Sequence, residues 1–195
     1  SIFLVDPNTP GVTIRPFTNI DGQKSSEIDF IDVTITGASR IGDPGDAFAA
    51  MEKVNDKAVL GVSAEAVGVL ETLLQKTVEY SKTRKQFGTV IGTFQALQHR
   101  MADMFIECQL ARSIVVMAAM KLDSSADQRE KTKAVSAAKS RVGKAIRRVS
   151  QEAVQIHGGI GVTNELDVGH YFKRATALEI MFGNTDYHVE RFASL

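Results

Sequence analysis

The chain has 195 residues, of which 44% are hydrophobic and 24% are charged, and its 23 basic and 23 acidic side chains give no formal net charge. That length and apolar content suffice for one domain with a hydrophobic core, or for one domain plus part of another. A neutral balance argues against partners that need a basic surplus, so we expect neither nucleic acid nor a membrane surface. No apolar run approaches a bilayer span, and a single cysteine excludes an intrachain disulfide framework. We therefore expect a soluble protein of a reducing compartment, the cytoplasm.

The first 47 residues contain all four prolines and are predicted to form β-strands. Short strands are expected at residues 2–5 and 12–15, and a third at residues 28–35. The apolar alternation of the third changes phase, which indicates a bulge or bend near residues 30–32. Three or four strands without a partner sheet bury their faces poorly. We therefore expect residues 1–47 to be the C-terminal portion of a larger, antiparallel β domain.

The remaining 148 residues lack proline and carry apolar side chains at the three- and four-residue spacing of helices. This pattern predicts helices at residues 47–82, 94–122, 128–156 and 165–181. Four helices with short connections predict an antiparallel up-down bundle, so residues 48–195 are expected to form one mainly α domain.

Two polar segments stand out at the ends of these helices. Arg84, Gln86 and Phe87 lie in the loop between the first two helices, and a guanidinium in such a loop suits a phosphate or pyrophosphate group. Gln155, followed by Gly158 and Gly159, closes the third helix, where glycines permit close approach of a ligand to the backbone. From spacing alone, a solvated basic loop and an ordinary helix C-cap are the favoured interpretations of these two segments.

Two residue types are predicted to have no special chemistry. Cys108 lies on an apolar helix face and is expected to be a packed core thiol. The four histidines lack any paired-ligand spacing, so we expect no metal site.

In combination, these motifs resemble the acyl-CoA dehydrogenase family over nearly the whole chain. The matching residues, which keep the family's order and spacing, are Phe87-Gly88, Phe94-Gln95, Ala102-Asp103-Met104, Ala111-Arg112, Ala153-Val154-Gln155-Ile156-His157-Gly158-Gly159-Ile160-Gly161 and Gly183. The resemblance implies that the chain begins inside the family's middle β domain and keeps the whole C-terminal four-helix bundle.

The resemblance also implies a function in fatty acid metabolism. Family members oxidise an acyl-CoA thioester to the 2-enoyl-CoA with FAD and pass electrons to an electron-transferring flavoprotein. Their helical bundle serves the FAD of a neighbouring subunit, which implies a homo- or hetero-oligomer, either a dimer or a tetramer. The residues that would contact FAD here are Arg84, Gln86, Phe87, Phe94, Gln95, Gln155, Gly158 and Gly159.

One position departs from the family pattern. Phe182 occupies the place of the usual catalytic Glu, and Ala58 occupies the alternative place on the first helix. We therefore expect no catalytic base in this chain, which resembles the Glu-lacking partner of a two-subunit enzyme such as the small subunit of pimeloyl-CoA dehydrogenase. Two alternatives remain open. The first is an active homo-oligomeric dehydrogenase with a displaced base, for which Glu179 and Asp186 are the nearest acids; the second is a structural subunit that binds no flavin.

Overall fold

The computed structural model describes residues 1–195, which divide into two compact units, Ser1–Asn55 and Asp56–Leu195. In the first unit, β1 (Ile2–Phe3) pairs antiparallel with β4 (Arg40–Ile41). The main hairpin joins β2 (Val12–Thr18) to β3 (Lys24–Phe30), with Val12 opposite Phe30 and Thr18 opposite Lys24. A short 3-10 helix, η1 (Gly37–Ser39), precedes β4.

The predicted third strand is wrong in its second half. Strand β3 ends at Phe30 instead of continuing to residue 35, and Asp32 has a left-handed φ of 50°. The phase change in the apolar pattern therefore marks the end of a strand and a bend, which lies within the residues where a bulge or bend was expected.

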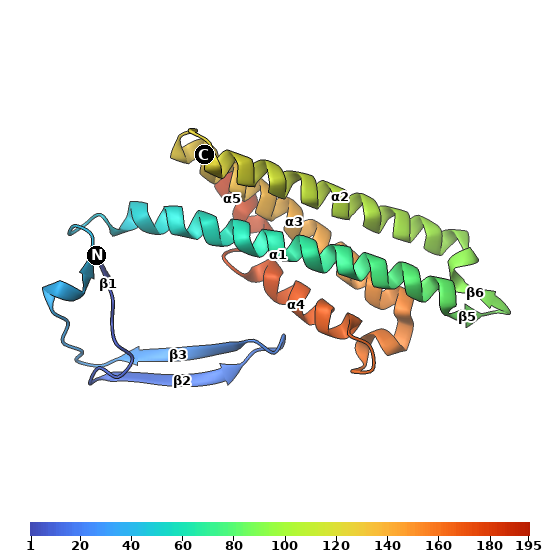
Figure 1. Ribbon diagram of the computed structural model, residues 1–195, viewed down its shortest axis with the longest axis horizontal. Helices are drawn as coiled ribbons and strands as arrows, with labels where there is room; N and C mark the ends of the chain where they lie inside the picture. The colour runs from blue at the N-terminus through green and yellow to red at the C-terminus, as the bar shows by residue number, and fades with distance from the viewer. The chain divides into compact units, whose positions relative to one another are not determined.

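The second unit holds the helical bundle, shown in Figure 1. Its helices are α1 (Ala47–Thr83, which begins in the first unit), α2 (Gln95–Asp123), α3 (Gln128–His157), α4 (Val168–Ile180) and α5 (Thr185–Ser194). The hairpin of β5 (Lys85–Gln86) and β6 (Thr89–Val90) and the 3-10 helix η2 (Ile91–Thr93) connect α1 to α2. A 3-10 helix, η3 (Gly158–Val162), follows α3. The predicted fold class, a four-helix up-down bundle preceded by part of an antiparallel β domain, is confirmed.

Helix α3 is the most deeply buried of the long helices because its apolar residues and small residues face its neighbours on several sides. Its N-cap is Asp127, whose carboxylate accepts a hydrogen bond from the amide of Glu130 at 2.8 Å. The bundle core contains Leu70, Leu73, Met104, Cys108, Val142, Ile146, Val149 and Leu178. The thiol of Cys108 is inaccessible, as expected, and burial raises its pKa to about 12.

Helix α5 has no counterpart among the predicted helices. Its buried residues are Thr185 and His188, which are polar, so an apolar periodicity could not reveal it. The signal that was available is its N-cap, because the Asn184 side chain accepts a hydrogen bond from the amide of Tyr187 at 3.0 Å.

Helix α1 also corrects the expectation that no segment approaches a membrane span. It is long enough to cross a bilayer and contains an 18-residue window of mean hydropathy 1.4, of which 39% is buried within the protein. One such helix is weak evidence for a membrane, because core helices pass the same test. Leu70 and Leu73 of α1 are fully buried in the bundle core.

Asp56 links α1 to α3 and α5 through a buried cluster of hydrogen-bonded polar side chains. Its carboxylate is fully buried and accepts hydrogen bonds from Thr132 at 2.6 Å, Gln128 at 3.0 Å and Arg191 at 2.8 Å. Asp56→Asn removes the charge that Arg191 pairs with, and we expect it to lower the free energy of unfolding by about 1–3 kcal/mol. Urea denaturation measures this loss.

The matched control for Asp56 is Asp123→Asn, because Asp123 ends α2 and has no ion pair. We expect the control to change the free energy of unfolding by less than about 0.5 kcal/mol. Equal stabilities for the two variants would show that the Asp56 cluster contributes nothing beyond a neutral hydrogen-bonded site.

Candidate functional site

The loop between α1 and α2 is a tight hairpin that presents an aromatic side chain to solvent. Lys85 pairs with Val90 and Gln86 with Thr89, so Phe87 and Gly88 form the two-residue turn. Both turn residues have positive φ, 54° and 83°, as type I′ hairpin turns require. Phe87 is 92% exposed, and its ring meets Phe94 edge to face at 6.1 Å. A bulky residue in left-handed backbone is unusual enough to suggest a functional reason for its presence.

The end of α3 supplies the opposite wall of the site. Gly158 caps the helix with a φ of 67°, and its amide donates to the carbonyls of Gln155 and Val154. No atom lies within 4 Å of the place where a side chain on Gly158 or Gly159 would begin, so this backbone is open to a ligand. A side chain at Gly158 would also have to adopt the left-handed conformation that glycine tolerates.

These two segments enclose a cavity of about 490 Å³, here called the hairpin cavity. Its lining residues are Tyr80, Arg84, Gln86, Phe87, Ile91, Phe94, Ala96, Leu97, Arg100, Gln155, Ile156, His157, Gly158 and Gly159. Seven of the eight predicted cofactor-binding residues are among them. The exception is Gln95, an exposed residue at the start of α2 that is flanked by two lining residues.

The charge of the hairpin cavity comes chiefly from Arg84. No hydrogen bond or ion pair within the chain engages its guanidinium, whereas the other lining arginine, Arg100, is paired with Glu152 at 3.0 Å. An arginine without an internal partner, beside open glycine backbone and aromatic rings, suits a ligand that carries both phosphate and a flat ring.

Some lining residues were not predicted from the sequence. Tyr80 lies one helical turn before Arg84, so the i, i+4 rule could have placed it on the same face of α1. His157 was considered as a metal ligand and as part of the family motif but not as a lining residue, although it ends the helix that carries Gln155. The described residues contain no cluster of His, Cys, Asp and Glu that could hold a metal ion.

The turn between α4 and α5 carries Phe182, and its carbonyl is tightly held. Phe182 has a φ of 56° and is 46% exposed. Its carbonyl faces the Nε2 atom of His188 at 3.0 Å, while the amide of Gly183 donates to the carbonyl of Ile180. The His188 ring is fully buried, and burial lowers its pKa. The ring is therefore neutral at pH 7, with its proton on Nε2, the atom that donates to Phe182.

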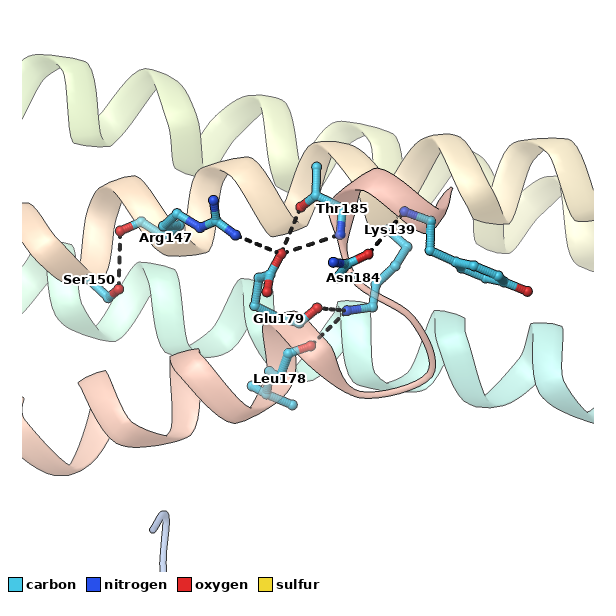
Figure 2. A network of polar contacts seen from close by, with 8 residues as sticks. Lys139, Arg147, Ser150, Leu178, Glu179, Asn184 and Thr185 are labelled. Carbon is cyan, nitrogen blue, oxygen red and sulfur yellow. Dashed lines mark hydrogen bonds and ion pairs between the residues drawn. The ribbon is translucent and has the colours of Figure 1, made fainter. Parts of the chain in front are cut away.

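The acid nearest in sequence before Phe182 is engaged in structural contacts. Figure 2 shows one carboxylate oxygen of Glu179 receiving Arg147 at 3.2 Å, the hydroxyl of Thr185 at 3.0 Å and the amide of Thr185 at 3.3 Å. These contacts tie the end of α4 to the start of α5. Asp186, the acid that follows Phe182, is an exposed residue in the first turn of α5.

Lys139 lies beneath the same turn and gives the fold a pH dependence. Its ammonium group donates to the carbonyls of Leu178 and Glu179 at 2.7 and 2.9 Å, and burial lowers its pKa from 10.5 to about 8, with the charge of Glu179 opposing the shift. Between these two values the unfolded chain keeps a proton that the folded chain has released. The free energy of unfolding should therefore rise with pH in this window, by at most about 1.4 kcal/mol per pH unit from this group.

We expect Lys139→Met to abolish this rise of the free energy of unfolding with pH. Urea denaturation between about pH 8 and pH 9, just above the lowered pKa of Lys139 in the folded chain, measures it. Cys108 acts in the opposite direction at higher pH, because its folded pKa of about 12 exceeds its ordinary value of 9.0. The comparison of wild type with Lys139→Met cancels the thiol contribution, and identical slopes would contradict the role of Lys139.

The sequence and the fold both match known proteins. Residues 48–194 match the family model described as acyl-CoA dehydrogenase, C-terminal domain. A probable acyl-CoA dehydrogenase of Bacillus subtilis, YngJ, is 35% identical over 189 residues, which cover 95% of this chain and 49% of that protein. The chain thus spans about half the length of this relative.

Solved structures show the same fold over 98% of this chain and 50% of theirs. The ChsE4–ChsE5 complex of Mycobacterium tuberculosis matches with a TM-score of 0.88 and 29% identity. A structure of PigA with FAD and proline matches with a TM-score of 0.91 and 29% identity. The family model covers three quarters of the sequence, and the fold is shared along the chain. The chain therefore belongs to the acyl-CoA dehydrogenase family.

Proposed function

We propose that this chain is part of an FAD-dependent acyl-CoA dehydrogenase that introduces a double bond between the α and β carbons of an acyl-CoA thioester. In this proposal residues 48–195 form the C-terminal domain and residues 1–47 the end of the middle β domain. The bundle contributes half of an FAD site to a neighbouring subunit that carries the catalytic Glu. The observation that carries the proposal is the hairpin cavity, which gathers seven of the eight residues expected to contact FAD.

The residues of the hairpin cavity fit the adenosine and pyrophosphate part of FAD. Its volume of about 490 Å³ lies within the range typical of ligand sites, roughly 300–1,000 Å³. Arg84 has no internal counter-ion and can donate two parallel hydrogen bonds to a phosphate. The open backbone at Gly158 and Gly159 accommodates a close ligand, and the Gln155 amide offers a donor and an acceptor to a heterocycle. The structure of PigA with FAD and proline shares this fold.

The protein's part in the reaction is to bind and orient. When bound, FAD would supply the acceptor for the hydride that leaves the β carbon of the acyl-CoA. Arg84 neutralises phosphate charge, and the rings of Phe87 and Phe94 cover apolar ligand surface. Proton removal from the α carbon requires a carboxylate in a dry pocket, which the neighbouring subunit would supply.

Phe182 is the reason to propose a hetero-oligomer. A phenylalanine cannot accept a proton, and one oxygen of the Glu179 carboxylate is engaged by Arg147 and Thr185. A subunit that keeps cofactor-binding residues but lacks a base is useful only beside one that has the base. The ChsE4–ChsE5 complex, whose fold this chain shares, joins two differently named proteins.

The remaining partners follow from the family. We propose an electron-transferring flavoprotein as the electron acceptor and the cytoplasm as the location. The alternative of an active homo-oligomer needs Glu179 or Asp186 to act as the base, and the contacts of Glu179 disfavour it. The alternative of a flavin-free structural subunit is disfavoured by the unpaired Arg84.

The visible flavin spectrum of the intact protein, expressed without a partner, tests the proposal. It is recorded before and after anaerobic addition of butyryl-CoA or octanoyl-CoA. Little bound flavin, or flavin that does not bleach, is the expected result. Bleaching would show that the chain has a working base of its own. Purification of the native oligomer through a tag on this chain should then recover FAD, and a flavin-free oligomer would overturn the half-site.

A further inference from the structure

The hairpin cavity has two walls that come from distant parts of the sequence. Arg84 directly follows α1, whereas Gln155 and Gly158 lie at the end of α3. A ligand that touches both walls binds well only if their spacing is fixed before it arrives. Tyr80 of α1 and His157 of α3 contact each other between these walls.

Tyr80 holds the end of α3 in two ways. Its ring stacks on the ring of His157, with centroids 4.3 Å apart and an interplanar angle of 26°. Its hydroxyl donates to the carbonyl of His157 at 3.4 Å. That carbonyl belongs to the last turn of α3, where carbonyls have no partner within the helix.

The His157 ring is itself fixed in one orientation. The residue is 5% exposed, and its Nδ1 atom lies 2.7 Å from the carbonyl of Ala153, one turn earlier in α3. Burial lowers the pKa of His157, so the ring is neutral and carries its proton on Nδ1, the atom that donates to Ala153. Tyr80 therefore packs against a rigid surface rather than a mobile side chain.

Tyr80 is also held to the Arg84 wall, through the backbone. The amide of Arg84 donates to the carbonyl of Tyr80 at 2.9 Å, which continues the helical pattern of α1 up to the hairpin. Tyr80 is thus joined to Arg84 through a backbone hydrogen bond and to the end of α3 through its ring.

We infer that Tyr80 and His157 are positioning residues that set the distance between the Arg84 wall and the Gln155–Gly158 wall of the hairpin cavity. This inference rests on the proposed function and adds residues that act through others. Their contribution to FAD binding comes from the geometry of the two walls, in addition to any contact that they make with the ligand.

The test measures FAD affinity in the native oligomer purified through a tag on this chain, then stripped of flavin and titrated. Tyr80→Leu removes the stacking, and we expect about tenfold weaker FAD binding. Tyr80→Phe keeps the stacking and loses only a long hydrogen bond, so binding should recover to within about twofold of wild type. The control is Tyr171→Phe, because Tyr171 lines a neighbouring cavity of about 660 Å³, which Tyr80 and His157 also line, and does not line the hairpin cavity.

A coupling measurement separates positioning from general destabilisation. If Tyr80 acts by placing the end of α3, Tyr80→Leu should cost less FAD affinity in a Gln155→Ala background than in wild type. Equal losses in both backgrounds, or unchanged affinity for Tyr80→Leu, would overturn the inference. If the wild-type oligomer itself binds no FAD, the proposed function is wrong. Failure of the proposed function can therefore be told apart from failure of the inference about Tyr80 and His157.

Discussion

Arg84→Ala should weaken FAD binding by the native oligomer about 10- to 100-fold, the range expected when a hydrogen-bonded charge of about 1.5–3 kcal/mol is lost. The guanidinium lines the hairpin cavity and has no ion pair within the chain, so its charge is available to a phosphate. Equilibrium dialysis or quenching of flavin fluorescence measures the affinity. Arg84→Lys keeps the positive charge but loses the planar guanidinium group. Its affinity for FAD should therefore lie between those of wild type and Arg84→Ala.

The absence of an internal partner makes this prediction specific to the ligand. Since nothing in the chain depends on the guanidinium, Arg84→Ala should change the free energy of unfolding by less than about 0.5 kcal/mol. Arg112→Ala is the matched control, because Arg112 is also exposed and its partner is Glu71 at 3.2 Å, away from the cavity lining. We expect Arg112→Ala to bind FAD as tightly as wild type does. If Arg84→Ala also bound FAD as tightly as wild type, the proposed half-site for FAD would be contradicted.

The bundle could be predicted from the sequence because its apolar spacing reflects a buried face. Helix α1 was expected at residues 47–82 and runs over Ala47–Thr83, and α3 was expected at residues 128–156 and runs over Gln128–His157. Helix α4 begins at Val168 rather than at residue 165, because residues 163–167 form bends and a turn before it. Helix α5 escaped prediction because its buried face, Thr185 and His188, is polar.

The candidate site could be predicted only where side chains belong to a recognisable motif. Arg84 and Gln155 were identified in this way, and the fold brings them to one cavity. Tyr80 and His157 belong to that cavity through a stacking contact between residues far apart in the sequence. Such a contact depends on how two helices cross, which local spacing does not determine. The buried carboxylate of Asp56 likewise gave no sequence signal, since its partners lie on two other helices.

Phe182→Glu should give this chain a catalytic base, so that a flavin-containing complex dehydrogenates an acyl-CoA at this subunit. General acid–base catalysis typically raises a reaction rate about 10²- to 10⁴-fold, and we expect the rate of dehydrogenation at this subunit to exceed that of wild type by a factor in that range. The backbone already suits the substitution, because Phe182 tolerates a φ of 56° and Glu has a similar cost there. The hydrogen bond from His188 to the carbonyl of residue 182 does not involve the side chain and should persist.

Phe182→Gln is the control that isolates the proton acceptor, because its amide has nearly the shape of the carboxylate and does not act as a base. The readout is anaerobic bleaching of the flavin by butyryl-CoA or octanoyl-CoA in an oligomer whose partner subunit has its own Glu replaced by Gln. Bleaching with Glu and none with Gln supports the assignment of Phe182 to the base position. No bleaching with either would mean that residue 182 does not face the α carbon. Bleaching in wild type would instead direct attention to Asp186, the nearby acid whose carboxylate is exposed.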